Sequence, residues 1–239
     1  MVRNRVAPKL RIVSRSSEPL RDRHEAGRLL GLELSSLRGQ GAVVLGIPRG
    51  GVIVACELAR ALDAELDVVL SRKLRTPGHW ELAMGSVAED GRVFLNEMVL
   101  KDSGISQASI AQEKAAQVAE IARRSELIRH VRPKVSLQGR LAIITDDGVA
   151  TGATTLAAIW AARQEHPKKL IAAIPVGSEN TVIRLADEVD EMICLRAPPF
   201  FDAVGQFYMR FGPVEDEEVL EILKAEQERL SHQQMDAPG

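Results

Sequence analysis

Short apolar segments alternate with segments of helical periodicity along most of the 239-residue chain. Apolar runs bounded by glycine, proline or charged residues predict strands, and these runs cover residues 41–48, 64–74, 140–145, 169–175 and 191–195. Helical patterns flank them at residues 22–37, 50–62, 153–164, 179–187 and 214–230. Strands that are apolar on both faces and alternate with helices are typical of a parallel sheet covered on both sides. The sequence therefore predicts an α/β fold with a single parallel sheet flanked by helices.

One region interrupts this alternation. Residues 75–86 contain proline and glycine without a clear period, and they predict a loop. Residues 84–96 predict a hairpin with Asp90 and Gly91 at its turn. A short helix is expected after residue 96, and a long one at about residues 106–131, where good helix formers predominate.

The chain shows no internal repeat and no low-complexity linker, so we expect one main domain that carries an insertion. This domain is expected to cover residues 18–230, with the insertion at about 74–132 and a small C-terminal hood at about 196–212. A basic N-terminal arm, residues 1–17, precedes it, and residues 231–239 are expected to form a flexible tail.

Composition excludes several classes of protein. The net charge of −2 gives no general attraction to nucleic acid or to an anionic membrane. Short basic arms such as residues 1–17 are usually solvated, so we expect no nucleic-acid partner. No apolar run approaches the roughly 20 residues that span a bilayer, and the first residues lack the core of a signal peptide. Cys56 and Cys194 lack metal or redox spacing, which predicts free thiols and a cytoplasmic location.

The most informative segment is "LAIITDDGVATGATTLAAIW", residues 141–160. Its apolar run ends at Asp146 and Asp147, at the carboxyl end of a predicted strand, where open parallel sheets bind ligands. The loop of small residues that follows leads into a helix, so backbone N–H groups and the helix dipole can bind a phosphate. The carboxylates instead suit hydroxyl groups or a divalent cation beside that phosphate. A sugar phosphate suits both the loop and the carboxylates. The two acids could also be structural, with one of them capping the helix.

The segment "AIITDDGVATGATT" closely resembles the motif that binds 5-phosphoribosyl 1-diphosphate (PRPP) in type I phosphoribosyltransferases. From "RDRHEAGRLL" to "DEEVLEIL", the chain resembles the uncharacterised, predicted phosphoribosyltransferase branch of that superfamily. The resemblance implies transfer of the phosphoribosyl group to a nitrogenous base or other small acceptor, with release of pyrophosphate. It also implies a Mg²⁺-assisted pentosyltransferase of nucleotide metabolism that forms a homodimer.

The same resemblance assigns residues to the substrate. Asp146 and Asp147 would hold the ribose hydroxyls and Mg²⁺. The loop that follows would bind the 5′-phosphate through Gly148, Val149, Ala150, Thr151, Gly152, Ala153, Thr154 and Thr155, with hydroxyl donors from Thr151, Thr154 and Thr155.

Two further motifs match the diphosphate side of PRPP. The "GIPRGG" segment resembles the pyrophosphate loop, in which Arg49, Gly50 and Gly51 would contact phosphate oxygens. The "SRKL" segment resembles the Arg-Lys pair of orotate and adenine phosphoribosyltransferases, and Arg72 and Lys73 would reach the diphosphate. Both motifs also have purely structural interpretations. The first could be a glycine-rich turn, and the second a solvated pair of basic residues.

The acceptor side matches the family less closely. Residues 74–85 would be the mobile loop that closes over substrate, and Glu81 would lie near the transferred group. The segment "PPFFDAVGQFY" resembles the hood of purine salvage enzymes, in which Phe201 or its neighbour Phe200 would stack on the base, or both would belong to the core. Ala150 stands where hypoxanthine-guanine enzymes carry an acid, which disfavours an oxopurine acceptor with that mechanism.

Three functional hypotheses follow. The first is the transferase described above. The second is a non-catalytic regulatory protein that binds PRPP or a nucleotide, as some relatives of this superfamily do. The third is a structural protein that retains the loops without binding PRPP. The Arg72–Lys73 pair and the length of the closing loop favour the enzyme.

Overall fold

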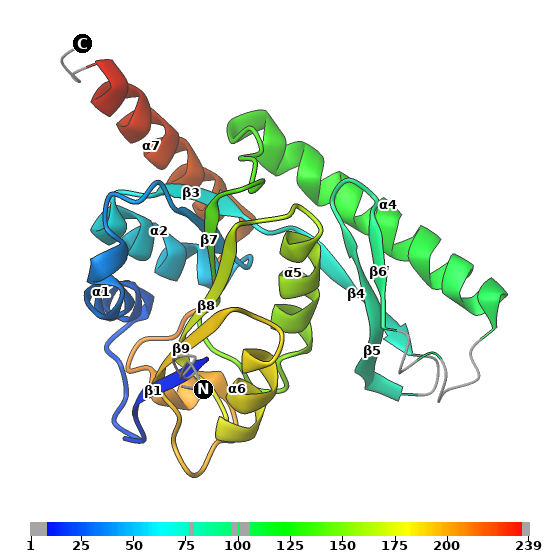
Figure 1. Cartoon of the computed structure of the whole chain (residues 1–239), viewed down its shortest axis with the longest axis horizontal. Helices are drawn as coiled ribbons and strands as arrows, with labels where there is room; N and C mark the ends of the chain where they lie inside the picture. Colours follow the sequence, from blue (N-terminus) through cyan, green and yellow to red (C-terminus); the bar gives the residue numbers. More distant parts are fainter. Residues whose placement is uncertain (1–8, 77–78, 97–99, 101–105, 236–239) are drawn as a thin grey trace, which may run out of the picture.

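The computed structural model describes residues 9–76, 79–96, 100 and 106–235. Six parallel strands form the main sheet in the order β1-β9-β8-β7-β2-β3 (Figure 1). Their bounds are β1 Leu10–Ser14, β2 Val43–Gly46, β3 Glu65–Val68, β7 Leu141–Thr145, β8 Lys169–Val176 and β9 Glu191–Arg196. This arrangement confirms the predicted α/β fold with a parallel sheet.

Helices cover both faces of this sheet. Successive strand residues point to opposite faces, so Val44 and Ile143 join one apolar cluster while Leu45 and Ile144 join another. Helices α1 (Arg23–Glu33), α2 (Gly50–Leu62) and α7 (Asp216–Met235) pack on the first face. Helices α5 (Ala153–Arg163) and α6 (Glu179–Ala186) pack on the second. Short 3₁₀ helices occupy Ser35–Leu37 (η1) and Val204–Phe207 (η2).

The insertion forms a second, antiparallel sheet in the order β4-β5-β6, beside which the long helix α4 lies (Figure 1). The bounds are β4 Ser71–Thr76, β5 His79–Ala88, β6 Val93–Leu95 and α4 Gln107–Val131. The predicted hairpin is confirmed as β5 and β6, with Gly91 at a φ of 78° in its turn. The long helix is also confirmed, whereas the predicted short helix falls mostly on residues outside the described part of the chain.

Two predictions about the insertion were wrong. The single strand expected at residues 64–74 is two strands, because β2 ends at Gly46, opposite Val68, and leaves the following residues without a partner in the main sheet. The described residues of the loop expected at residues 75–86 belong to β4 and β5. Register shifts on both sides of Arg75 break the two-residue period of these strands, which explains the absence of a strand pattern in the sequence.

The ends of the chain also differ from expectation. Residues 10–14, assigned to the basic arm, form β1 and pair with β9 at the edge of the main sheet. Helix α7 continues to Met235, so residues 231–235 of the expected flexible tail are helical. Asp22 caps α1, since its carboxylate accepts a hydrogen bond of 2.9 Å from the Glu25 amide. Within the described residues, the helices are too short or too polar to cross a membrane.

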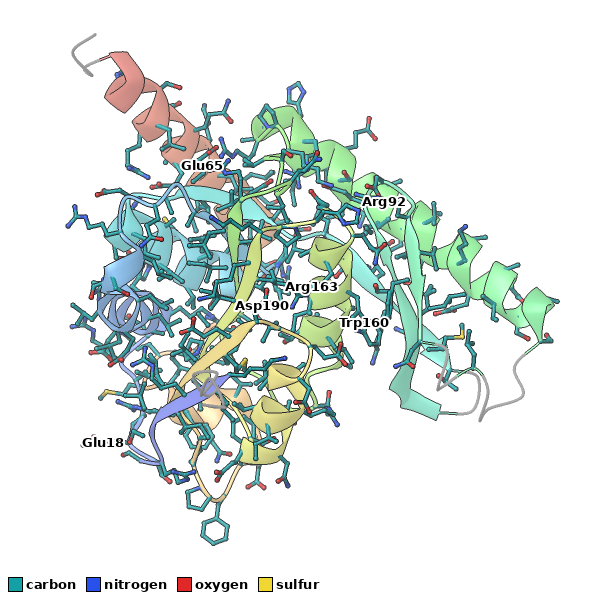
Figure 2. The ribbon with its side chains drawn as sticks, viewed as in Figure 1. Glu18, Glu65, Arg92, Trp160, Arg163 and Asp190 are labelled. Atoms are coloured by element: carbon teal, nitrogen blue, oxygen red, sulfur yellow. The ribbon has the colours of Figure 1, made fainter. Side chains whose placement is uncertain are left out.

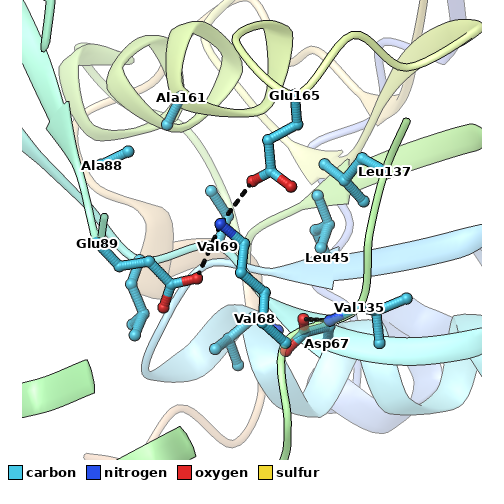
Figure 3. Close-up of a pocket in the computed structure, with 12 residues that line it drawn as sticks. Leu45, Asp67, Val68, Val69, Ala88, Glu89, Val135, Leu137, Ala161 and Glu165 are labelled. Carbon is cyan, nitrogen blue, oxygen red and sulfur yellow. Dashed lines mark hydrogen bonds and ion pairs between the residues drawn. The ribbon is translucent and has the colours of Figure 1, made fainter. Parts of the chain in front are cut away.

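Aromatic and ionic contacts join the two sheets. The ring of Trp160 on α5 lies 4.6 Å from the ring of Phe94 on β6, and Figure 2 shows Trp160 directed toward the second sheet. Arg129 on α4 bridges Asp67 at 2.6 Å and Glu89 at 2.8 Å. Lys134 adds ion pairs with Glu89 and Glu165, which Figure 3 shows at this junction. The insertion is therefore fixed to the main sheet near residues 65–69.

Candidate functional site

The loops that follow β2 and β7 meet at one edge of the main sheet. Gly46 lies opposite Thr145, and the Ile47 amide donates a 3.0 Å hydrogen bond to the Thr145 carbonyl. Between these loops lies a pocket of about 400 Å³. Its lining is Arg23, Ile47, Pro48, Arg49, Gly50, Asp146, Asp147, Thr154, Phe211, Pro213 and Val214. The pocket thus unites residues from two sequence motifs, "GIPRGG" and "AIITDDGVATGATT", that were predicted separately.

The paired acids lie close together and are only partly exposed. The Asp147 amide donates a 2.8 Å hydrogen bond to Oδ1 of Asp146, which fixes one carboxylate against the next residue's backbone. Burial raises the pKa of Asp146 well above its ordinary value, and the neighbouring Asp147 carboxylate raises it further. This arrangement places two carboxyl groups side by side, where they suit hydroxyl donors or a cation.

Glycines at the start of α2 make room for these acids. A Cβ atom on Gly50 would lie 2.0 Å from Oδ2 of Asp147, and one on Gly51 would lie 2.8 Å from the Cα of Asp146. The peptide bond between Pro48 and Arg49 is cis. Arg49 itself lines the pocket and forms an ion pair of 3.1 Å with Glu215. Glycine at position 50 is therefore required by the approach of the Asp147 side chain.

Three pocket-side residues escaped sequence analysis. Nε of Arg23 donates a 2.8 Å hydrogen bond to Oδ2 of Asp147, and its guanidinium lies 4.0 Å from the centroid of the Phe211 ring. The Tyr208 hydroxyl donates to the Asp147 carbonyl at 2.6 Å, and its ring stacks on Phe211 at 5.1 Å. Burial raises the pKa of Tyr208, which keeps this hydroxyl protonated as a donor. The hood is thereby attached to the second acid of the pair.

The hood contains the two aromatic residues, Phe200 and Phe201, that were expected either to stack on a base or to belong to the core. Phe201 is half-buried and stacks on Phe207 at 5.1 Å, so it packs with the main core. Phe200 is 84% exposed, and neither residue lines the pocket beside the acids. The aromatic side chain that lines it is Phe211, which follows the motif used for the prediction. The sequence contained the hood's aromatic cluster but no signal for which ring faces the pocket.

The loop from Gly148 to Gly152 is held by contacts with β8 and α6. The Val149 amide donates to the Val176 carbonyl at 2.8 Å, and the Thr181 hydroxyl donates to the Ala150 carbonyl at 2.7 Å. Arg184 also donates to the carbonyl of Thr151. These contacts engage backbone carbonyls of the loop and orient its polypeptide toward the start of α5.

The N-terminus of α5 has the features of an anion site. Gly152 occupies its cap with a φ of 75°, a conformation that glycine adopts readily. In the described part of the chain, no side chain caps this helix, so its first N–H groups can receive an anion. Thr154 is exposed and lines the pocket, and Thr151 and Ala150 are exposed nearby. Thr155, predicted as a hydroxyl donor, is only 1% exposed, so its hydroxyl is covered and that expectation is corrected.

A second pocket of about 290 Å³ adjoins the first, since Ile47, Pro48 and Thr154 line both. Arg72 and Lys73, predicted to reach a diphosphate, line this second pocket. Arg72 also forms a 2.6 Å ion pair with Glu120 on α4. Glu81, expected near the transferred group, lies in β5, and its side chain is outside the described residues.

The donor set was also compared with the requirements of Mg²⁺. Among the described residues, no three or more His, Cys, Asp or Glu side chains form a metal-binding cluster. Magnesium commonly binds proteins through one or two carboxylates and takes its remaining ligands from substrate phosphates and water. Asp146 and Asp147 fit that incomplete type of site.

Comparisons with known proteins cover most of the chain. Residues 24–210 match a family model described as "Phosphoribosyl transferase domain". A Mycobacterium tuberculosis protein named "Putative phosphoribosyl transferase Rv0571c" is 44% identical over 202 residues, which are 84% of this chain and 46% of that protein. The chain therefore spans about half the length of the curated relatives it matches. The crystal structure of TT1426 from Thermus thermophilus has a TM-score of 0.82 and 44% identity, covering 87% of this chain and 98% of that chain.

Proposed function

This chain belongs to the phosphoribosyl transferase family, and we propose that it transfers the phosphoribosyl group of PRPP to a nitrogenous base or other small acceptor, releasing pyrophosphate. The observation that carries the proposal is the pocket that unites Asp146, Asp147, Arg49 and Thr154. These residues come from two motifs: "GIPRGG", which the resemblance assigns to the diphosphate, and "AIITDDGVATGATT", which it assigns to the ribose and the 5′-phosphate.

Each part of the pocket then has a role. The N–H groups at the start of α5 and the Thr154 hydroxyl bind the 5′-phosphate. Asp146 and Asp147 accept hydrogen bonds from the ribose hydroxyls. Arg49 binds diphosphate oxygens as a charged fork. Together these contacts fix both ends of the sugar and leave its anomeric carbon between them.

The transfer itself requires charge stabilisation more than covalent chemistry. The ribose passes through a state resembling an oxocarbenium ion, in which positive charge develops at the anomeric carbon and ring oxygen. The carboxylates of Asp146 and Asp147 favour that charge, and the cationic side chains favour the departing diphosphate. When bound by Asp146 and Asp147 with the substrate, Mg²⁺ supplies further neutralisation of the diphosphate.

Several roles in the proposal come from the family resemblance. Arg72 and Lys73 contact the diphosphate from the second pocket, and Glu81 lies near the transferred group. A homodimer and a cytosolic location are also part of the proposal, the latter in keeping with the two buried free thiols, Cys56 and Cys194. Light scattering on the purified protein tests the homodimer.

The first test measures PRPP binding by calorimetry with Mg²⁺, and pyrophosphate release against a panel of nitrogenous acceptors. We expect PRPP binding and release with at least one acceptor. Asp147→Asn should lower turnover on the order of 10²-fold, because electrostatic contacts in the transition state are lost. Asp187→Asn, an exposed site at the end of α6, is the matched control.

The outcomes separate the competing hypotheses. Binding of PRPP without release under any acceptor would support the regulatory protein instead of the enzyme. Absence of PRPP affinity in the wild-type protein would refute both. Unchanged turnover in Asp147→Asn would remove the paired acids from the mechanism.

A further inference from the structure

The second pocket extends beyond the residues that the family resemblance assigns to PRPP. The insertion supplies much of its wall, through Arg75 on β4 and through Gln117, Ile121 and Arg124 on α4. It opens toward the first pocket at Ile47, Pro48 and Thr154. A molecule in the second pocket would therefore lie next to a sugar held in the first.

The polar part of this wall is cationic. Arg72, Lys73, Arg75 and Arg124 line the pocket, and none of its described lining residues is acidic. Two of the arginines are partly neutralised from outside it, Arg72 by Glu120 at 2.6 Å and Arg124 by Asp216 at 3.5 Å. In the described part of the chain, no carboxylate pairs with the guanidinium of Arg75, whose side chain is exposed. The pocket therefore attracts a negatively charged group.

Arg124 also has an unused donor. Its Nε atom is buried and has no hydrogen-bond partner among the described residues, although the side chain as a whole is 28% exposed. A buried donor without an acceptor costs on the order of 1–3 kcal/mol, so such atoms usually have a partner that completes them. A carboxylate in the pocket would pair with the guanidinium of Arg124, which lines it.

Most of the remaining wall is apolar. Ile47, Pro48, Val69, Leu70 and Ile121 offer surfaces against which a flat ring can pack, and the Gln117 amide offers both a donor and an acceptor. The volume of about 290 Å³ lies near the lower end of the roughly 300–1,000 Å³ range of small-molecule sites. Because Arg72 and Lys73 are assigned to the diphosphate, the space that remains beside α4 suits a single-ring heterocycle.

We propose that the second pocket binds the acceptor, and that the acceptor is a single-ring nitrogen heterocycle carrying a carboxylate, which Arg75 and Arg124 recognise. This inference rests on the proposed transferase function. In the transfer, the ring nitrogen forms a bond to the anomeric carbon, while the bond from that carbon to the diphosphate oxygen breaks. The bonding electrons leave with pyrophosphate. A ring N–H loses its proton to water, whereas a pyridine nitrogen has none to lose and becomes a pyridinium.

The experiment compares acceptors that carry a carboxylate with neutral acceptors that have the same ring. Pyrophosphate release is measured with orotate against uracil and with nicotinate against nicotinamide, in the wild-type protein, Arg124→Gln and Arg75→Gln. Arg123→Gln is the matched control, since Arg123 is an exposed neighbour on α4 that does not line the pocket. We expect the wild-type protein to prefer a carboxylate acceptor at least about tenfold, as a charge-assisted hydrogen bond implies.

The variants decide which ligand the arginines serve. Arg124→Gln and Arg75→Gln should each raise the KM of the carboxylate acceptor about tenfold and change the neutral acceptor's KM much less. The proposal would be overturned if the wild-type protein used the neutral acceptors as efficiently as the carboxylate acceptors. A rise in the KM for PRPP, equal with both acceptors, would assign the arginines to the diphosphate and also overturn it.

Failure of the transferase function would be recognised separately. If no acceptor supports release, calorimetry with nicotinate and nicotinamide in the absence of PRPP decides the subsite alone. Tighter nicotinate binding that is lost in Arg124→Gln would support a carboxylate subsite. Equal binding of the two compounds, or no binding of either, would refute it.

Discussion

At the scale of single residues, the paired acids are placed for ligand binding at a cost to the stability of the ligand-free fold. Asp146 lies where its carboxylate loses hydration and faces the charge of Asp147, and both effects raise its pKa. Arg23 compensates Asp147 directly through the 2.8 Å contact to Oδ2. The site thus holds one acid whose charge is partly balanced and one whose ionisation is disfavoured. Such opposition is common where charge is positioned for a ligand.

Asp146→Asn should stabilise the ligand-free protein at neutral pH. Because the pKa of Asp146 is raised by folding, its contribution to stability is fully present below the unfolded pKa of about 3.9 and is lost as pH rises through the folded pKa. Asparagine removes this ionisation and can still accept from the Asp147 amide. We expect a Tm higher by about 2–4 °C at pH 7 and a gain that shrinks toward pH 4.

Thermal denaturation between pH 4 and pH 8 without PRPP measures this gain, with the exposed Asp202→Asn as control. A gain that grows toward acid would contradict the assigned direction of the shift. The same variant should bind PRPP more weakly, because it lacks the negative charge beside the ribose.

At the scale of elements, α7 is attached to α2 by a buried acid. Glu226 is 2% exposed and pairs with Nε of Arg60 at 2.6 Å and with Nε of Arg229 at 2.8 Å. The buried residues Val219 and Leu223 place the apolar side of α7 against the same cluster. Position within an acidic, polar helix gave no indication that this one glutamate faces the interior.

Glu226→Gln should destabilise the fold by about 1–3 kcal/mol, because the two buried charge-assisted hydrogen bonds weaken while the arginines stay in place. The free energy of unfolding in urea measures the loss. Glu228→Gln, two residues along the same helix at an exposed position, should change it by less than about 0.5 kcal/mol. Equal effects of the two substitutions would mean that the Glu226 contacts contribute little.

At the scale of the whole molecule, the insertion is joined to the main sheet through a partly buried ionic junction that includes Asp67 and Glu89, two residues labelled in Figure 3. Asp67 at the end of β3 is 1% exposed, and burial raises its pKa while Arg129 opposes part of that rise. Its carboxylate also accepts from the amides of Val68 and Val135. Since α4 supplies one wall of the second pocket, this junction sets the distance between the two pockets.

Arg129→Gln should loosen the insertion without unfolding the main sheet. It removes the cation that joins Asp67 to Glu89, so amides of α4 near residue 129 should exchange faster with deuterium, about tenfold or more. Amides of β7 and β8 should keep wild-type exchange. Arg123→Gln, exposed on the same helix, is the control. Uniform acceleration across both sheets would show that the junction supports the whole fold instead.

The sequence by itself determined the parallel sheet and the meeting of its motifs at one edge. All six strands run the same way, so the segments after β2 and β7 had to end at the same edge of the sheet, while the observed strand order places them side by side. Local periodicity and the small residues of the loop carry that information. The pairing of β4 with β5 was not predictable in this way, because register shifts near Arg75 remove the period.

Only the tertiary structure decided what surrounds the acids. Arg23 lies 124 residues from Asp147 in the sequence, and Tyr208 lies 61 residues from it. Phe211 rather than Phe201 lines the pocket because the hood packs one aromatic ring on the core and another against Arg23. Contacts between distant segments depend on how helices and the hood pack on the sheet, and no local spacing encodes that packing. The same reason applies to Arg124, which reaches the second pocket only because α4 lies beside β4.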